Sequence, residues 1–393
     1  MGLTTAQLPL TSEPTHHEPL TPPLEPKSAA TVPPRTGHGE SYPALVWRRL
    51  RKSWTGMLGL LLVVGLLLMA VFADFLSPVD PKVTDIAFAP PQAISFRDKD
   101  GNFSFAPRTY KLGEGEELDP ITFQPIVGPD YDHPQWLGFF VKGAPYFLLG
   151  FIPADRHFFG AVDGSPVHLL GTDKFGRDVL SRIFYGARIS LMIALTVVAI
   201  ITVVGTTVGM VSGYFGGRFD AWMQWFVDLI LAFPQLPLYL ALTSLIPVTA
   251  PTNVFLAFVI FVMSALGWAQ LSREVRGKTL ALARIDYVRA AVAIGATDRR
   301  IIFQHILPNV MSHVIVAITL AIPSVVLLES FLGFLGFAVK PPLISWGLML
   351  QDTATYSVIG SYPWILAPVG AVLITVFAFN ALGDGLRDAI DPY

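Results

Sequence analysis

The sequence predicts an all-α polytopic membrane protein with six transmembrane helices and a small β-rich insert between the first and second helices. Of its 393 residues, 52% are hydrophobic and only 14% are charged, whereas roughly a quarter of the residues of a soluble domain are charged. Uncharged apolar stretches recur along the chain, and each is long enough to cross a bilayer, which takes about 20 residues of helix. One segment is instead rich in Pro, Gly, Asp and aromatic residues and lacks helical periodicity.

The apolar stretches define six crossings. They are residues 53–73, 189–217, 229–272, 306–328 and 353–383. The third stretch is long enough for two helices. Pro247 and Pro251 supply the turn between them. Helix is the expected form, since a chain in lipid must satisfy its own backbone hydrogen bonds. The predicted organisation is a tail 1–45, a first transmembrane helix 46–76, an insert 77–168 and a five-helix core 169–393 with a charged loop 273–308.

Basic residues predict the orientation of these crossings. Arg48, Arg49, Arg51 and Lys52 precede the first helix, and basic residues next to a span favour the cytoplasmic side. Six crossings then place the loop 273–308 on the same side, and this loop carries more basic than acidic residues. We therefore expect both termini in the cytoplasm and the insert on the opposite, extracytoplasmic face.

Composition and motifs exclude several classes of protein. The chain has no cysteine and therefore no disulfide or thiolate metal site, and its net charge of −2 gives no basic balance for nucleic acid. Gly277, Lys278 and Thr279 hint at a phosphate loop, but Ser272 stands where its first glycine is needed and the segment leaves a membrane helix. We predict no catalytic, cofactor or metal site.

The tail and the insert have distinct compositions. The tail is rich in proline and is predicted to be disordered. In the insert, residues 94–97 and 103–105 flank the sequence Asp-Lys-Asp-Gly-Asn at 98–102, which predicts a β-hairpin with an Asp-Gly turn. The same carboxylates resemble the start of a calcium loop, but the closing glutamate is missing. The turn is therefore favoured over a calcium site.

The charged loop contains a helix, a glycine and a second helix. Residues 284–294 can form a short helix with Tyr287, Ala291 and Ile294 on one face. Gly295 can end this helix in the left-handed conformation that a helix terminus often takes.

Thr297 can cap the second short helix, with Asp298 in its first turn. Pro308 is expected to stop that helix and to begin the next span. The product is a rigid lever joined to two transmembrane helices. The alternative is an interfacial loop lying on anionic lipid.

Polar and proline residues interrupt the spans. Asp228 in the third helix and Glu329 in the fifth are costly in lipid unless they are paired or hydrated. They either line a water-filled path or have a structural role in the bundle. Pro234 and Pro237 are expected to kink the third helix, and Pro323 the fifth. The candidates for the translocation path or bundle interior are Asp228, Pro234, Glu329 and Asn380.

The loop resembles the EAA loop of ABC importer permeases, whose pattern is Glu-Ala-Ala, three residues, Gly, nine residues and Ile-x-Leu-Pro. The matching positions are Ala290, Ala291, Gly295, Leu307 and Pro308. Arg289 replaces the Glu, which puts in doubt any charge contact made by that residue. His305 replaces the Ile, and a histidine at this position is similar to the dipeptide/oligopeptide/nickel branch.

Other stretches resemble the same branch. They are 171–182 (GTDKFGRDVLSR) with 186–190, Glu329 with 331–336, Pro342 with 345–347, and 380–392. The resemblance covers the first helix and everything from about Leu169 onward, whereas the tail and the insert lie outside the common pattern. Together these motifs imply the permease subunit of an ATP-driven importer for di- or oligopeptides, in a prokaryotic cell membrane.

The resemblance also implies partners and site residues. The partners would be a second homologous permease, one or two cytoplasmic ATPases that use the ATP and Mg, an extracytoplasmic binding protein, the peptide and the bilayer. The chain itself would bind no cofactor. The implied ATPase-coupling residues are Asp286, Tyr287, Arg289, Ala290, Ala291, Gly295, Ala296, Asp298, Arg299, Arg300, His305 and Pro308.

Three alternatives remain open at this stage. The same kind of transporter could carry nickel, opines or oligosaccharides. An intramembrane enzyme could use Asp228 and Glu329 as paired acids. A stand-alone channel or proton-coupled carrier would need no ATPase.

Overall fold

The computed structural model describes residues 42–97, 102–118, 120, 125–247 and 249–390. Residues 1–41 of the predicted tail therefore lie outside the described residues. The chain divides into two units, Met1–Tyr42 and Pro43–Tyr393. All the described elements lie in the second unit, apart from the first residue of α1.

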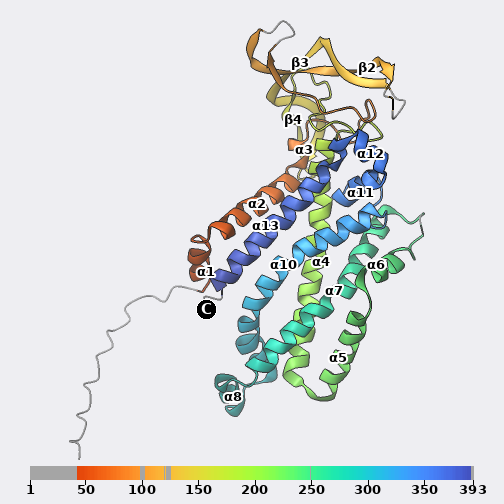
Figure 1. The fold of residues 1–393 in the computed structure, drawn as a ribbon. Coiled ribbons are helices and arrows are strands. Elements are labelled where there is room, and N and C mark those ends of the chain that lie inside the picture. Colours follow the sequence, from red (N-terminus) through yellow and green to blue (C-terminus); the bar gives the residue numbers. More distant parts are fainter. Residues whose placement is uncertain (1–41, 98–101, 119, 121–124, 248, 391–393) are drawn as a thin grey trace, which may run out of the picture. The chain divides into compact units, whose positions relative to one another are not determined.

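Long helices form most of the described chain, as predicted (Figure 1). Five helical runs are long and apolar enough to cross a membrane: α2 (Trp54–Val71), α4 (Val179–Phe215), α7 (Thr252–Leu282), Asp298–Phe334 and Pro363–Ile390. The fourth run comprises α9 (Asp298–Arg300), η1 (Ile301–Ile306) and α10 (Leu307–Phe334), and the fifth comprises η3 (Pro363–Leu366) and α13 (Ala367–Ile390). The shorter helices are α1 (Tyr42–Leu50), α3 (Ala73–Leu76), α8 (Asp286–Ala293), α11 (Trp346–Leu350), η2 (Gln351–Ala354) and α12 (Tyr356–Ser361).

The sixth candidate span is broken. Helices α5 (Gly217–Ala232) and α6 (Gln235–Thr243) meet at an angle of 84°. Pro234 lies at this break as the N-cap of α6, and it cannot donate a backbone hydrogen bond to the preceding turn. Pro237 falls in the first turn of α6, where proline is tolerated, and α10 continues through Pro323 as one helix. The predicted interruption of the third span is thus at Pro234, and Pro323 ends no helix.

Helices α4 and α7 run side by side in the same direction. Gly205, Gly209 and Gly213 follow each other at four-residue spacing on α4 and meet progressively later residues of α7. A Cβ atom at Gly209 would lie 2.5 Å from the Ser272 carbonyl oxygen, so the small residue allows the backbones to approach closely. Because α4 and α7 are parallel neighbours, α5 and α6 must return the chain along the bundle between them. This arrangement supports six crossings.

The charged end of α7 differs from the prediction. Residues 273–282 were assigned to the loop because they carry several charges, but α7 continues as helix to Leu282. Arg273 pairs with Asp228 of α5, and Arg276 Nη2 lies 2.6 Å from Asp220 Oδ2 of the same helix. These pairs compensate charges that would otherwise be unfavourable within a membrane helix.

The insert contains a four-stranded antiparallel sheet in the order β1-β2-β3-β4. Its strands are β1 (Ser95–Arg97), β2 (Phe103–Leu118), β3 (Pro125–Leu148) and β4 (Ile152–Ala161). The pairing of Arg97 with Phe103 confirms the predicted first hairpin, although residues 98–101 of its turn lie outside the described residues. Among the described residues, no cluster of His, Asp or Glu could hold a metal ion.

The insert is attached to the bundle through α3. A ring nitrogen of His157 in β4 lies 3.1 Å from the Asp74 carbonyl oxygen, and the Phe75 ring contacts those of Phe140 and Phe158. Asp74 is held in turn by Arg188 of α4, whose Nη2 is 2.7 Å from Asp74 Oδ2. The sheet therefore lies at the end of the bundle where α4 begins, and α8 lies at the opposite end (Figure 1).

Candidate functional site

The first candidate site is the elbow, which we define as the segment from α8 to η1, Asp286–Ile306. Gly295 sits at the turn after α8 with φ +84°. The Ala296 N–H donates to the Ala291 carbonyl at 3.0 Å, and the Gly295 N–H donates to the Val292 carbonyl at 3.0 Å. This pair of bonds is a Schellman motif, which satisfies the last carbonyls of a helix. The predicted left-handed glycine is confirmed, and it fixes the direction in which the chain leaves α8.

The second half of the elbow starts at a side-chain cap. The Arg300 N–H donates to the Thr297 hydroxyl at 3.4 Å, and Asp298 occupies the first turn. The Tyr214 hydroxyl at the end of α4 donates to Asp298 Oδ1 at 2.7 Å. The elbow is therefore connected to a third long helix in addition to α7 and α10, a link that the sequence did not reveal.

Pro308 does not stop the helix, contrary to the prediction. The chain passes from α9 through a π-helical turn, η1, into α10 with Pro308 in its first turn. A π turn widens the helix where proline leaves a hydrogen bond unmade. The Asn309 amide donates to the His305 carbonyl at 2.7 Å and to the Tyr287 hydroxyl at 3.1 Å. The second half of the elbow, from Asp298 onward, and the span are thus one continuous helical element.

Burial separates the predicted elbow residues into two groups. Val288 and Ala291 are the buried residues of α8, whereas Tyr287 and Ile294 are exposed. Of the three residues predicted on one face, Tyr287, Ala291 and Ile294, only Ala291 is buried, because α8 packs through Val288 and Ala291. Ala296 and His305 are half-buried. The exposed members of the predicted set are Asp286, Tyr287, Arg289, Ala290, Gly295, Asp298, Arg299, Arg300 and Pro308.

The exposed surface of the elbow mixes apolar and charged side chains. Ile294 is 86% exposed and Phe303 57% exposed, and Arg299 and Arg300 lie between them in the sequence. A depression of about 420 Å³ is lined by Thr297, Arg299, Arg300, Phe303 and Gln304. Apolar anchors beside arginines are typical of protein interfaces.

The second candidate site is a polar face on α5, α7 and α10. Asp228 and Arg273 form an ion pair in which both side chains are exposed. At the next position of α7, Glu274 Oε1 accepts from Gln270 Nε2 at 2.9 Å, and His313 Nε2 of α10 lies 3.3 Å from Glu274 Oε2. Charges facing lipid are unfavourable, so this polar face is suited to water or to a polar protein surface. Asp228 is a residue predicted from the sequence, whereas Glu274 falls within the predicted loop 273–308 and His313 belongs to no sequence motif.

Glu329 occupies a different environment. Its side chain is fully buried, and the Ser190 hydroxyl of α4 donates to Glu329 Oε2 at 3.0 Å. The Trp346 N–H donates to the same Ser190 hydroxyl at 3.1 Å, and the Trp346 indole donates to the Ile183 carbonyl at 3.0 Å. Glu329 therefore joins α4, α10 and α11 inside the bundle. The remaining path candidates, Asp228, Pro234 and Asn380, are exposed.

The structure does not pair the two intramembrane acids. Asp228 is bound to Arg273 on the exposed face, whereas Glu329 is bound to Ser190 in the interior. Two acids that act together in catalysis must lie within reach of one reacting group. The paired-acid alternative was therefore wrong.

A buried histidine ties the insert to the start of α4. His168 Nδ1 lies 3.2 Å from Asp178 Oδ1, and His168 Nε2 lies 3.4 Å from Asp85 Oδ2. Burial lowers the pKa of His168, but Asp178 and Asp85 outweigh it, and the net pKa is raised above the usual value. Asp178 also caps α4 by accepting from the Ser181 N–H at 2.7 Å. Through Asp178, the 171–182 segment therefore joins the insert to the start of α4.

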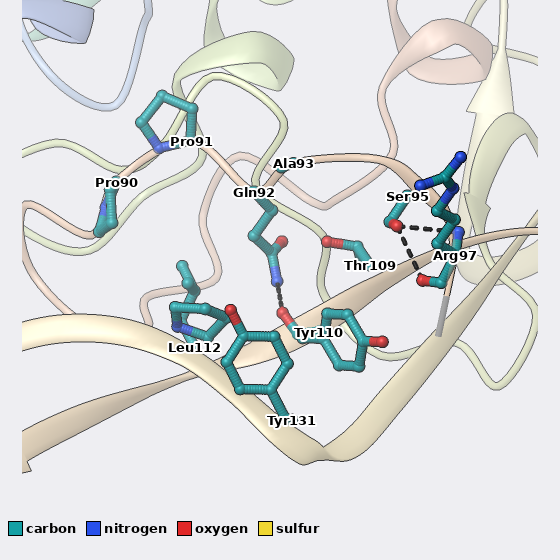
Figure 2. A pocket seen from close by; sticks show the side chains of 11 residues that line it. Pro90, Pro91, Gln92, Ala93, Ser95, Arg97, Thr109, Tyr110, Leu112 and Tyr131 are labelled. Carbon is teal, nitrogen blue, oxygen red and sulfur yellow. Dashed lines mark hydrogen bonds between the residues drawn. The ribbon is translucent and has the colours of Figure 1, made fainter. Parts of the chain in front are cut away.

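The insert contains a depression of about 700 Å³ (Figure 2). Gln92 points toward Tyr110, whose carbonyl accepts from Gln92 Nε2 at 2.8 Å. The Tyr110 and Tyr131 rings meet edge to face with centroids 4.9 Å apart, and the Tyr110 hydroxyl is buried without a hydrogen-bond partner. The depression also contains several prolines and Arg97, a composition suited to a protein or peptide surface.

Comparison with known proteins identifies the family. Residues 205–393 match the family of the binding-protein-dependent transport system inner membrane component, and residues 41–91 match the N-terminal TM domain of oligopeptide transport permease C. The chain belongs to this permease family. The permease is therefore a multi-pass inner-membrane subunit of a bacterial ABC transporter, and the ATPase activity belongs to separate subunits.

Curated relatives of the permease align over more than half of its length. It is 40% identical over 229 residues to the oligopeptide transport system permease protein OppC of Bacillus subtilis. This alignment covers 57% of this chain and 72% of the relative. It is 42% identical over 233 residues to OppC of Escherichia coli K12, covering 59% and 74%. It is 38% identical over 225 residues to the dipeptide transport system permease protein DppC of Bacillus subtilis, covering 57% and 68%.

Proposed function

We propose that this permease is one of two homologous subunits that form the membrane pathway of an importer for di- or oligopeptides. The peptide cargo is supported by the relatives, which are oligopeptide and dipeptide transport system permeases. In this proposal an extracytoplasmic binding protein delivers the peptide, and one or two cytoplasmic ATPases supply the energy. The permease itself binds no cofactor, because ATP and Mg belong to the ATPases.

The observation that carries the proposal is the construction of the elbow. The Schellman turn at Gly295 and the cap at Thr297 fix two short helices, and η1 continues without a break into α10. A displacement of α8 is therefore passed to α7 and α10 as rigid elements, and through Asp298 to α4. Coupling requires an element of this kind, with two discrete packings that a partner can bias.

In this proposal the exposed elbow residues contact an ATPase in the cytoplasm. Both termini would lie on the same side as the elbow. Arg289 replaces the usual glutamate on this surface, so the contact there would require an acidic or neutral group on the ATPase.

The polar face would line the pathway shared with the second permease. Asp228, Glu274 and His313 lie on this face, and Pro234 lies where the third span bends. A peptide carries both charges and backbone polar groups, which such a face can hydrate or bind. Glu329 would act inside the bundle by positioning α11 against α4, and Asn380 would lie on the exposed side of α13.

The insert would dock the binding protein or shield the mouth of the pathway. Its depression offers aromatic and proline side chains for such a contact. Deletion of residues 81–167 should weaken binding-protein affinity and uptake. Unchanged affinity and uptake would contradict this part of the proposal.

The coupling role is tested by Gly295→Val in the reconstituted transporter. We expect uptake to fall at least tenfold while ATP hydrolysis continues, because valine at φ +84° forces the turn to change. Gly295→Asn should recover much of the uptake, since asparagine tolerates this conformation. Gly370→Val is the matched control, because a side chain at Gly370 of α13 meets open space.

The outcomes of this experiment separate coupling from folding. The amount of membrane-inserted permease should be equal in the three variants. Normal coupled uptake by the Gly295→Val variant would contradict the proposal. The cargo is tested separately by competition: uptake that peptides do not inhibit would overturn the peptide assignment and leave the coupling role intact.

A further inference from the structure

The turn between β3 and β4 has an unusual composition for a hairpin of an extracytoplasmic insert. We define the hairpin tip as residues 147–152 (FLLGFI). No charged residue occurs between Lys142 and Asp155. Phe151 is 71% exposed, Phe147 63% and Leu149 50%. Single exposed apolar residues are common on protein surfaces, but a contiguous group marks a contact with another apolar phase or partner.

The backbone of the hairpin tip has positive φ angles at two successive residues. Leu149 has φ +55° and Gly150 φ +83°, and the Gly150 N–H donates to the Phe147 carbonyl at 3.1 Å. Tight hairpins in water prefer Asn-Gly or Asp-Gly at such positions, because leucine is disfavoured at positive φ. A leucine here is unfavourable for the turn itself, so its apolar side chain must contribute something that asparagine would not.

The position of the hairpin tip shows what surrounds it. Leu149 and Gly150 line a depression of about 530 Å³ together with residues of α2 and α4. The residues from α2 are Leu67, Ala70 and Val71, and those from α4 include Leu191, Met192, Leu195 and Thr196. Leu67 lies within the membrane-spanning length of α2, about 6 Å from its last residue at 1.5 Å per residue. The tip thus reaches the level of two membrane spans.

Within the β3–β4 hairpin, the charged residues on either side of the tip are Lys142 and Asp155. Lys142 and Asp155 face each other across the two strands at 3.8 Å, and the strand from 143 to 148 extends about 20 Å beyond them at 3.3 to 3.4 Å per residue. Arg188 and Asp74 form the charged border of the same depression. The depression that Leu149 lines is also lined by exposed apolar residues of α2 and α4, among them Val71 and Met192.

From these observations we infer that the hairpin tip inserts into the outer leaflet of the lipid bilayer beside α2 and α4. The insert would therefore be held at both ends of its β3–β4 hairpin: by α3 through His157, and by lipid through the tip. The partner is the acyl-chain region of the membrane, because the tip offers no charge to a headgroup. This inference depends on the membrane location of the chain and is independent of its cargo.

A single-cysteine experiment tests the inference directly, because the chain has no cysteine. The full chain carrying Phe151→Cys is spin-labelled in lipid bilayers, and the collision rates with oxygen and with a water-soluble nickel chelate are measured. Leu61→Cys on α2 is the lipid-facing control and Phe105→Cys on β2 is the water-facing control, since both side chains are well exposed. Leu149→Cys provides a second reporter in case Phe151→Cys disturbs the turn.

The inference predicts a high oxygen and low nickel collision rate at 151 and 149, within about twofold of the Leu61 control. Collision rates with nickel like those of the Phe105 control would overturn it and place the tip in water. Low collision rates with both reagents would also overturn it, because they would show that a protein surface covers the tip.

Discussion

Two regions of the permease expose large apolar side chains, and they differ in the charge that surrounds them. On the elbow, Ile294 and Phe303 lie among arginines and aspartates. On the hairpin tip, Phe147, Leu149 and Phe151 have no charged neighbour in the sequence. Protein interfaces combine apolar anchors with arginine and a polar rim, whereas charge is unfavourable in acyl chains. In our proposals this difference has a function: the elbow would bind protein, and the tip would contact lipid.

The two regions also differ in how they are held. The elbow is fixed by a Schellman turn, a side-chain cap and the bond from Tyr214 to Asp298. The tip is a turn with a leucine at positive φ, and it joins the paired strands β3 and β4. A rigid element suits the transmission of force, and a simple apolar loop suits anchoring.

The largest effect is expected from Ile294→Asp on the elbow. Loss of an apolar anchor at an interface commonly weakens binding by about 2 kcal/mol or more. We therefore expect the affinity for the ATPase subunits to fall at least tenfold, measured by titration of the detergent-solubilised permease. Phe105→Asp on β2 is the matched control and should leave the affinity unchanged. Equal affinities for all three proteins would show that the elbow does not bind the ATPase.

A smaller effect is expected from Phe151→Asp on the hairpin tip. A charge placed in the outer part of the acyl-chain region costs roughly 1 kcal/mol, which is enough to shift the tip toward water several-fold. A spin label at Phe147→Cys should then collide less with oxygen and more with the nickel chelate. ATPase affinity should not change, and a change there would erase the distinction between the two regions.

Thr297→Ala should lower the stability of the helical turn that starts at Asp298 only slightly. Loss of a threonine cap typically costs 0.5 to 2 kcal/mol, and we expect about 0.5 kcal/mol because the bond is 3.4 Å long and exposed. Hydrogen exchange at the Arg300 amide should accelerate about twofold. Thr355→Ala at the N-cap of α12, where the threonine makes no side-chain cap bond, is the control. Unchanged exchange at Arg300 would mean that the cap contributes nothing to rigidity.

The smallest effect concerns the pH dependence of the insert. Burial lowers the pKa of His168, but Asp178 and Asp85 together raise this pKa by more than burial lowers it. The pKa in the folded protein therefore exceeds the unfolded value of about 6.5. The stabilisation is therefore complete below pH 6.5 and is lost as pH rises through the folded pKa. Amides of the β2–β3 pairing should exchange faster at alkaline pH after correction for intrinsic rates.

His168→Gln should remove this corrected pH dependence, and the exposed His133→Gln should preserve it. A slope that persists in the His168→Gln variant would assign the effect to another group. Neither variant should alter the affinity of the elbow for the ATPase, because the two lie at opposite ends of the bundle.

Local features of this permease could be predicted from the sequence. The Gly295 turn and the Thr297 cap depend on residues within a few positions of each other, and the structure contains both. Five of the predicted crossings, the broken candidate for the sixth and the strand-rich insert follow from apolar stretches and composition. Pro234 breaks its span because proline cannot donate a backbone hydrogen bond to the preceding turn.

Contacts between distant residues could not be predicted. Arg273 was placed in a loop because its partner, Asp228, is 45 positions away, and only the fold brings them together. Glu329 meets Ser190 across 139 positions. The Pro308 prediction failed because a π turn absorbs the missing hydrogen bond, and no residue pattern announces such a turn.

The account depends most on the elbow being a cytoplasmic docking site, and its exposure to reagents tests this directly. Ala290→Cys places one reactive thiol on the exposed side of α8 in a chain without cysteine. A membrane-impermeant maleimide should label it in inside-out vesicles stripped of ATPase, and restoring the ATPase should reduce labelling at least fivefold. Labelling in right-side-out vesicles, or labelling that the ATPase does not reduce, would contradict the account.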